Sequence, residues 1–181
     1  MDLTTFWLLF TLSLLLIMAF ATCWWCVWML WPLLHRGGPY VPSSGEAVAT
    51  MLRLAELKPE DVITDLGSGD GRIVVAAAKA GVKEAVGYEI HPGLVRMSQA
   101  LAKVSGVSAT AKFVRSSFWK ADFSKFSVVF LYQVPYAMDD LEPKLIKDLP
   151  VGARVVSNGF RFKTWIPVKD EEHVRVYVKA K

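Results

Sequence analysis

The feature that most constrains this chain is a run at 3–34 that contains no Asp, Glu, Lys or Arg. A helix needs about 20 apolar residues to cross the roughly 30 Å hydrocarbon core of a bilayer, and residues 6–31 supply them with few polar interruptions. Tryptophan prefers the headgroup level of both leaflets, and Trp7 and Trp28 would lie about 31 Å apart along a helix. The run therefore predicts one transmembrane helix within residues 1–35.

The charges around this run predict its orientation. A cleaved signal peptide with the small-residue site Ala19-Phe20-Ala21 is the alternative, but Asp2 stands where a signal peptide carries basic residues. The first positive charge is Arg36, and all 21 Lys and Arg residues lie from there onward. By the positive-inside rule, we expect a single-pass membrane protein whose C-terminal domain is cytoplasmic and lies against the lipid bilayer.

The chain of 181 residues has room for one globular domain after the apolar run. Residues 36–43 form a short segment rich in Gly, Pro and Ser, and the part that follows has the composition of a soluble protein. The sequence thus predicts an anchor at 1–35, a linker at 36–43 and one domain at 44–181.

Short β-branched runs alternate with helical stretches in this domain, which is typical of a parallel sheet covered by helices. A leading helix is expected at 44–57, and Pro59 is expected to end it. Ser43 is its predicted N-cap, with Glu46 completing a capping box. The pattern predicts an α/β, doubly wound, seven-stranded sheet with an antiparallel C-terminal hairpin. The expected strands are 61–66, 84–89, 110–115, 127–132 and 153–158, the expected helices 71–80, 92–104 and 138–148, and the expected hairpin 164–168 with 173–179.

A glycine-rich loop, Asp65-Leu66-Gly67-Ser68-Gly69-Asp70-Gly71-Arg72, follows the first expected strand and opens a helix. Ligands of open parallel sheets bind beyond the carboxyl ends of the strands, and a helix N-terminus there offers free N–H groups. The spacing G-x-G-x-G differs from the dinucleotide fingerprint G-x-G-x-x-G, because Arg72 stands at the third glycine position. Glu89 ends the second strand twenty residues after Gly69, where a carboxylate can accept from both ribose hydroxyls. The arrangement predicts a nucleotide-type ligand.

The G-x-G-x-G spacing, with Asp65 two residues before the first glycine, resembles motif I of the S-adenosylmethionine-dependent methyltransferases. This resemblance implies the Rossmann-like methyltransferase sheet and S-adenosyl-L-methionine as cofactor. It implies that the glycines approach the methionine part of this cofactor. Asp65 would hold the loop and bind the amino group of the cofactor, and Glu89 would bind its ribose. Ile90 would press on the adenine, and Ser117 would bond the base where many relatives have Asp. The implied cofactor-binding residues are Asp65, Gly67, Ser68, Gly69, Gly71, Glu89, Ile90 and Ser117.

A closer resemblance rests on Pro39-Tyr40-Val41-Pro42-Ser43, the glycine loop, Gly87-Tyr88-Glu89 and Arg154-Val155-Val156-Ser157 before Trp165-Ile166-Pro167-Val168. This combination is similar to the family of small membrane-anchored protein-lysine N-methyltransferases. That family includes the mitochondrial enzymes acting on the ATP synthase c subunit and on the adenine nucleotide translocase. The resemblance implies a protein substrate that carries a lysine in or beside the membrane, and the absence of mitochondrial targeting features favours a prokaryotic relative.

The residues after the fourth strand are expected to face the transferred methyl group. Gln133-Val134-Pro135-Tyr136 loosely resembles the Asn/Asp-Pro-Pro-Tyr/Phe loop of amino-group methyltransferases. By that resemblance, Gln133 accepts a hydrogen bond from the amine and Tyr136 holds the cationic product by cation–π attraction. The alternative is that Tyr132 and Tyr136 are ordinary aromatics of the core or its rim.

Other classes of site find little support. Cys23 and Cys26 lie inside the apolar run, and the histidines are scattered without ligand spacing, so no metal is expected. The Lys and Arg residues are dispersed without interleaved aromatics, which argues against nucleic acid and for attraction to anionic headgroups. Two functions compete with lysine methylation: methylation of a membrane-soluble lipid amine or quinone precursor, and a non-catalytic cofactor-binding scaffold.

Overall fold

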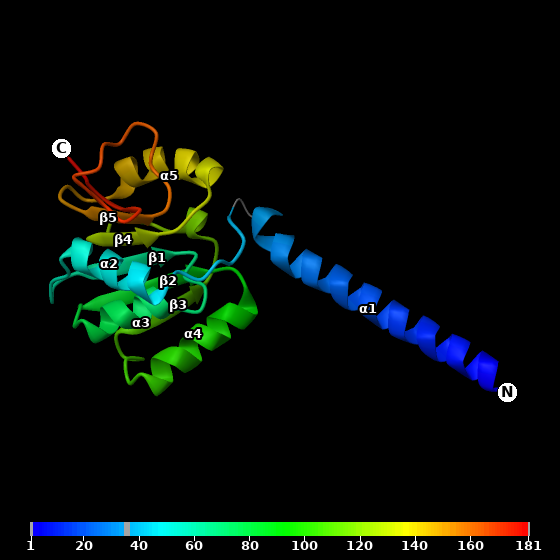
Figure 1. Ribbon diagram of the computed structural model, residues 1–181. Coiled ribbons are helices and arrows are strands. Elements are labelled where there is room, and N and C mark those ends of the chain that lie inside the picture. Colours follow the sequence, from blue (N-terminus) through cyan, green and yellow to red (C-terminus); the bar gives the residue numbers. More distant parts are fainter. Residues whose placement is uncertain (1, 35–36, 181) are drawn as a thin grey trace.

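The computed structural model describes residues 2–34 and 37–180, so the predicted boundaries at residues 1, 35, 36 and 181 lie outside the described residues. Figure 1 shows an α/β domain and a long N-terminal helix that projects away from it. The helices are α1 (Leu3–Leu34), α2 (Gly45–Ala55), α3 (Arg72–Lys79), α4 (Pro92–Val104) and α5 (Pro135–Asp148), with a short 3-10 helix, η1 (Phe118–Lys120). The strands are β1 (Val62–Leu66), β2 (Glu84–Glu89), β3 (Ala111–Arg115), β4 (Val128–Leu131), β5 (Arg154–Asn158), β6 (Lys169–Glu171) and β7 (Val174–Val178).

The seven strands form one sheet in the order β3-β2-β1-β4-β5-β7-β6. Strands β1 to β5 run parallel, whereas β7 pairs antiparallel with both β5 and β6. The strand order reverses between β1 and β4, and Asp65 at the end of β1 pairs there with Phe130. The predicted seven-stranded, doubly wound sheet with an antiparallel edge is confirmed, and its reversal point is the place where such sheets bind ligands.

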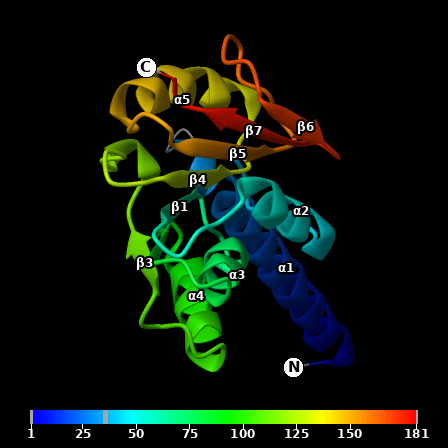
Figure 2. The same ribbon diagram turned by 90° about the vertical axis from the view of Figure 1, so that its left-hand side faces the viewer.

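Helices cover both faces of the sheet (Figure 2). On one face α2, α3 and α4 pack over alternate strand residues, and that layer contains Met51, Ile63 and Val74, all fully buried. On the other face α5 and the segment after β3 pack over the remaining positions, around Phe126 and Leu141. The sheet is therefore buried on both sides, as its nearly continuous apolar strands require.

Helix α1 has the length and apolar composition of a membrane-spanning helix, and its most apolar stretch is not buried against the domain. Its polar side chains bond to their own helix. The hydroxyl of Thr11 donates to the Trp7 carbonyl at 2.9 Å, and that of Ser13 donates to the Leu9 carbonyl at 2.7 Å. Because these hydroxyls are hydrogen-bonded within the helix, they can face lipid without an unpaired donor. Its C-terminal part approaches the domain, where the ring of Trp28 packs edge-on against His91, with centroids 4.7 Å apart.

The predicted boundaries of the leading helix were wrong by a few residues. Ser44 is the N-cap in place of Ser43, because the Ser44 hydroxyl accepts from the Ala47 N–H at 3.1 Å. The helix ends at Ala55, well before Pro59, since Glu56 takes the left-handed conformation with φ of 50°. Helix α5 begins at Pro135 instead of 138, because a proline suits the first helical position, where no N–H is needed.

The first strand of the predicted hairpin was also misplaced: β6 lies at Lys169–Glu171 and not at 164–168. The buried carboxylate of Glu142 accepts from the backbone N–H groups of Lys163, Thr164 and Trp165, which holds this segment as a loop. Burial raises the pKa of Glu142, but the hydrogen bonds from Thr164 and its neighbours outweigh it and lower the pKa below the usual value. The charged residues expected to form the turn supply the edge strand, where charge protects against further pairing.

Candidate active site

A pocket opens beyond the carboxyl ends of the central strands, at the reversal of strand order. Its floor comes from the glycine loop and from Glu89 and Ile90 after β2, and one wall comes from Ser116–Phe118 after β3. Gln133 and Tyr132 after β4 line the side next to α5. The pocket thus gathers side chains from four separate strand ends, as expected for this fold.

The glycine loop begins as a continuation of the sheet. The N–H groups of Gly67 and Ser68 both donate to the Tyr88 carbonyl at 2.9 Å. Gly67 and Gly69 have φ of 81° and 54°, which disfavours any side chain. A Cβ at Gly67 would come within 2.7 Å of Gln133 Nε2, and one at Gly71 within 2.6 Å of Ser98 Cβ in α4. The glycines are therefore required by the backbone turn and by close packing on both sides of the loop.

Glu89 ties the loop to the next helix. Its Oε2 accepts from the Gly69 N–H at 3.0 Å and its Oε1 accepts from the His91 N–H at 2.7 Å. The side chain is buried, and each carboxylate oxygen keeps a further lone pair for a ligand hydroxyl. The predicted ribose contact stays a prediction, and the two hydrogen bonds add a structural role that the sequence did not indicate.

Asp65 lies at the base of the pocket and is buried. Burial, the nearby charge of Glu89 and the charge of Asp70 together raise its pKa to about 8. A carboxyl group in such surroundings is stabilised as an anion by an incoming cation. The pocket therefore favours a positively charged ligand group next to Asp65.

Several buried polar atoms around this pocket lack a hydrogen-bond partner. Gln133 Nε2 donates to the Leu66 carbonyl at 2.7 Å, but its Oε1 is buried and unpaired, and so is the Ser68 hydroxyl oxygen. Leaving such a group unpaired costs about 1–3 kcal/mol. Both residues line the pocket, so a ligand that donates to them would relieve this cost.

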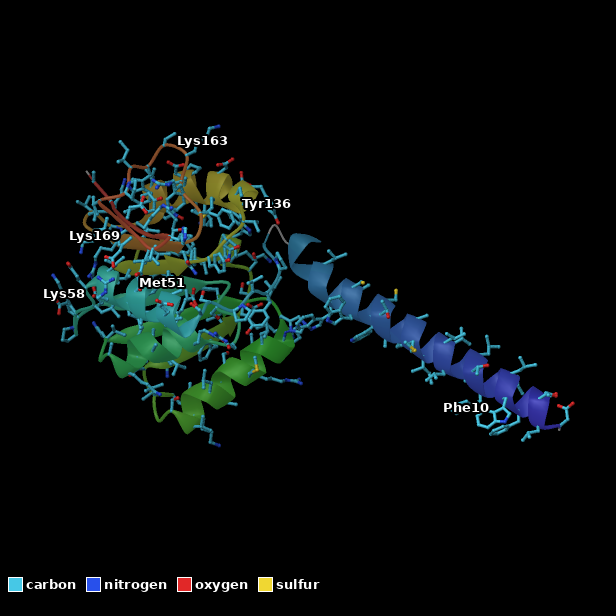
Figure 3. All side chains as sticks on the ribbon, viewed as in Figure 1. Phe10, Met51, Lys58, Tyr136, Lys163 and Lys169 are labelled. Carbon is cyan, nitrogen blue, oxygen red and sulfur yellow. The ribbon has the colours of Figure 1, made fainter. Side chains whose placement is uncertain are left out.

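The remaining predicted residues divide between the pocket and its edge. Ile90 and Ser117 line the pocket, and the Ser117 hydroxyl also caps η1 by accepting from the Trp119 N–H at 3.4 Å. Tyr136 is 47% exposed and lies outside the pocket lining, with its hydroxyl donating to the Gly37 carbonyl at 2.8 Å. Figure 3 shows Tyr136 at the side of the domain next to α1.

Residues 37–43, hereafter the strap, line the pocket as well, although the sequence suggested a linker. The ring of Tyr40 covers Gly69, whose added Cβ would lie 2.6 Å from Tyr40 Cε2. Burial and the charge of Asp70 raise the pKa of Tyr40. Arg72 Nη1 donates to the Ser43 carbonyl at 2.5 Å and Arg72 also pairs with Asp70. The sequence signal for an ordered segment was the pair of prolines, Pro39 and Pro42, around Tyr40, because prolines make a segment stiffer than a flexible linker.

A family model described as the ANTKMT methyltransferase domain matches residues 65–169, which include the glycine loop, Glu89 and Gln133. The chain belongs to this family. The resemblance drawn from the sequence, to the lysine methyltransferases of the ATP synthase c subunit and the adenine nucleotide translocase, is therefore confirmed.

Individual relatives agree with this family. A protein-lysine N-methyltransferase of Saccharolobus islandicus (strain REY15A) is 40% identical over 71% of this chain and 81% of its own length. The ATP synthase c-subunit lysine N-methyltransferase of Rattus norvegicus is 43% identical over 71% of this chain, but the match spans 59% of that protein. The crystal structure of an RNA methyltransferase from Salinibacter ruber, in complex with S-adenosyl-L-homocysteine, has a TM-score of 0.73 and 39% identity, covering 78% of this chain and 95% of that one.

The methyltransferase uses S-adenosylmethionine, and the pocket fits this cofactor. S-adenosylhomocysteine is what remains of it after the methyl group has left, and it is bound in the Salinibacter structure. The buried carboxylate of Glu89 and the raised pKa of Asp65 suit a ribose and an ammonium group. Within residues 2–34 and 37–180, no group of three or more His, Cys, Asp or Glu side chains is placed to hold a metal ion.

Proposed function

We propose that this methyltransferase transfers a methyl group to the side-chain amine of a lysine in a membrane protein. The names of its archaeal and rat relatives, a protein-lysine and an ATP synthase c-subunit lysine methyltransferase, support the acceptor. Helix α1 supports the membrane location. The single observation that carries the acceptor chemistry is the buried, unpaired Oε1 of Gln133, because it asks for a donor such as an amine N–H.

The chemistry demands little beyond positioning. S-adenosylmethionine supplies an electrophilic methyl group on a positively charged sulfur. A C–N bond forms as the C–S bond breaks, and the electron pair of the broken bond stays on sulfur. The amine must be neutral, and deprotonating a lysine at pH 7 costs on the order of 4–5 kcal/mol. In this proposal the unpaired Gln133 Oε1 accepts from that neutral amine and orients its lone pair, while partial burial disfavours the ammonium form.

The other predicted residues take their places in the same proposal. Glu89 accepts from the ribose hydroxyls of S-adenosylmethionine, and Asp65 binds its amino group. The methionine part of the cofactor lies against Ser68 and the backbone of Gly67, Gly69 and Gly71. Ile90 and Ser117 hold the adenine. Tyr136 lies outside the pocket lining, beside Gly37 of the strap, and in this proposal its half-exposed ring holds the methylated, cationic product as it leaves.

We further propose that the anchor holds this site at a membrane surface. We assign residues 1–35 to a single membrane span and residues 44–181 to a cytoplasmic domain, with the basic residues on the cytoplasmic side. The segment between them is short, and the contact between Trp28 and His91 brings the end of α1 to the cofactor pocket. A substrate embedded in the same bilayer would therefore meet the site at high local concentration.

The test is to incubate membranes of source cells lacking this chain with the purified enzyme and radiolabelled S-adenosylmethionine. Label in a protein band that hydrolyses to methyl-lysine is expected. The Salinibacter relative is described as an RNA methyltransferase, which supports RNA as a second candidate, so total RNA from the same cells is a parallel arm. The Glu89→Ala variant serves as the inactive control. Label confined to RNA, or to the lipid extract, would overturn the proposal.

A further inference from the structure

A second groove adjoins the cofactor pocket and is not used by the proposed cofactor contacts. It runs between the strap, the N-terminal half of α2 and the turn between β6 and β7. Its outer part, defined by the residues that do not also line the cofactor pocket, includes Glu46, Thr50, Asn158 and Glu172. The groove therefore leads from the surface of the domain toward the acceptor side of the site.

The outer part of the groove is acidic. Glu46 and Glu172 are exposed carboxylates, and the Thr50 hydroxyl donates to Glu172 Oε2 at 3.2 Å, which fixes the position of that carboxylate. None of the described residues that line the groove is Lys or Arg. Figure 3 places Lys58 and Lys169 on the side of the domain away from α1. The charge is complementary to a cation, although the chain as a whole carries a net charge of +4.

The inner part of the groove shares its lining with the cofactor pocket. Val41, Pro42, Ser43 and Tyr132 line both cavities. The Tyr132 ring stacks on Phe160, with centroids 6.3 Å apart and an interplanar angle of 22°, and so presents a fixed aromatic surface at the junction. Beyond Tyr132 the next residue is Gln133, whose buried Oε1 has no partner. A chain that enters at the acidic end would pass Val41, Pro42 and Tyr132 before it reaches Gln133.

We propose that this groove is the entrance for the acceptor lysine, with Glu46 and Glu172 capturing its cationic form and Tyr132 positioning its side chain. The inference rests on the proposed function and specifies how its substrate is recognised. Lysine combines an ammonium head with a long apolar stem, which matches an acidic outer wall followed by Val41, Pro42 and an aromatic ring. Beside the exposed carboxylates the ammonium group releases its proton to solvent, and the neutral amine reaches Gln133, whose buried surroundings disfavour a charged group.

The test measures the initial rate of methyl-lysine formation against the amount of added membrane, using membranes of source cells lacking this chain. Glu46→Gln and Glu172→Gln should each raise the apparent KM for membrane about threefold to tenfold, since a charge near a binding path acts mainly on capture. The kcat and the affinity for S-adenosylmethionine, measured by calorimetry, should stay within about twofold of wild type. Adding salt should raise the KM of the wild type more than that of the double variant.

Glu60→Gln is the matched control, because Glu60 is an exposed acid in the turn before β1 and lies outside both cavities. Glu46→Asp keeps the charge, so its apparent KM for membrane should lie close to that of the wild type. Tyr132→Phe keeps the ring, so it should raise this KM less than Tyr132→Leu does. If the wild type forms methyl-lysine but Glu46→Gln and Glu172→Gln match Glu60→Gln in KM, the entrance proposal is overturned. If the wild type forms no methyl-lysine, the proposed function itself is overturned, and this inference with it.

Discussion

The glycine loop at 65–72 and the strap at 37–43 both line the cofactor pocket, yet they depend on the rest of the chain in different ways. The loop is built from its own residues, with positive φ at the glycines and with hydrogen bonds to the adjacent strand β2. The strap has no regular structure, and distant residues hold it in place. Tyr136 donates to the Gly37 carbonyl, Arg72 donates to the Ser43 carbonyl, and the Tyr40 ring rests on Gly69.

One pocket thus combines a recognisable motif with a segment that has none. The loop can be recognised wherever a strand leads through G-x-G-x-G into a helix. The strap has a role only when the sheet has brought α3, α5 and the loop beneath it. We therefore expect changes in the loop system to abolish cofactor binding, and changes in the strap to weaken it by smaller factors.

The largest effect should come from Glu89→Ala, which removes the carboxylate that holds Gly69 and His91 and is proposed to hold the ribose. Loss of two charge-assisted hydrogen bonds, at about 1.5 kcal/mol or more each, corresponds to at least about a hundredfold weaker affinity for S-adenosylmethionine. Calorimetric titration measures this. Glu84→Ala at the other end of β2 is the control and should bind as wild type does. Unchanged affinity in Glu89→Ala would remove this residue from the site.

Two truncations should separate the strap from the anchor. Removing residues 1–35 should give a soluble domain that binds S-adenosylmethionine nearly as well as the full chain, because the strap remains. Removing residues 1–43 takes away Tyr40 and the bonds of Ser43 and Gly37, and should weaken binding about tenfold. Calorimetry and sedimentation on both proteins provide the measurement. Equal affinities would show that the strap contributes nothing to binding, and an insoluble shorter chain would argue against α1 as the only membrane-bound part.

Asp65→Asn should show opposite effects on stability and on binding. In the free enzyme the pKa of Asp65 is about 8 against an ordinary value of 3.8, so the folded state holds an extra proton between these values. Wild-type stability therefore falls as pH rises from about 4 to 8, and Asn removes this loss, which the two pKa values put on the order of 5 kcal/mol near pH 8. Affinity for S-adenosylmethionine should fall about tenfold, since the amino end loses its counter-charge. Melting temperatures of both proteins, measured from pH 5 to pH 8, test the stability effect. The same dependence of melting temperature on pH in both proteins would contradict it.

The smallest effect should come from Tyr136→Phe. Loss of its hydrogen bond to the Gly37 carbonyl costs about 0.5–1.5 kcal/mol, or a few degrees in melting temperature. The ring remains, so turnover should stay within about threefold of wild type. Tyr136→Ala removes the ring too, and should lower turnover about tenfold with cofactor affinity near wild type. If Tyr136→Ala lowers stability, binding and turnover together, Tyr136 supports the strap and does not hold the product.

Predictions from the sequence succeeded where the signal is local. The doubly wound, seven-stranded sheet was predicted from alternating patterns, because five buried strands joined by crossovers leave few arrangements. The predictions failed where hydrogen bonds from distant residues set the local structure. The first strand of the hairpin was misplaced because Glu142, more than twenty residues away, captures the backbone at 163–165. Likewise, Ser44 and not the predicted Ser43 is the N-cap of α2. Ser43 is buried, and its carbonyl accepts a hydrogen bond from the distant Arg72.

Residue types and short spacings were enough to predict the apolar helix, the glycine loop and the acid at the end of β2. Long-range packing put the strap in the lining of the pocket, bound Glu89 to the loop and bound the Tyr136 hydroxyl to the Gly37 carbonyl. Local patterns could not predict these contacts, because they join residues up to about a hundred positions apart. Their geometry arises from how the sheet packs, and no local pattern of the chain records it.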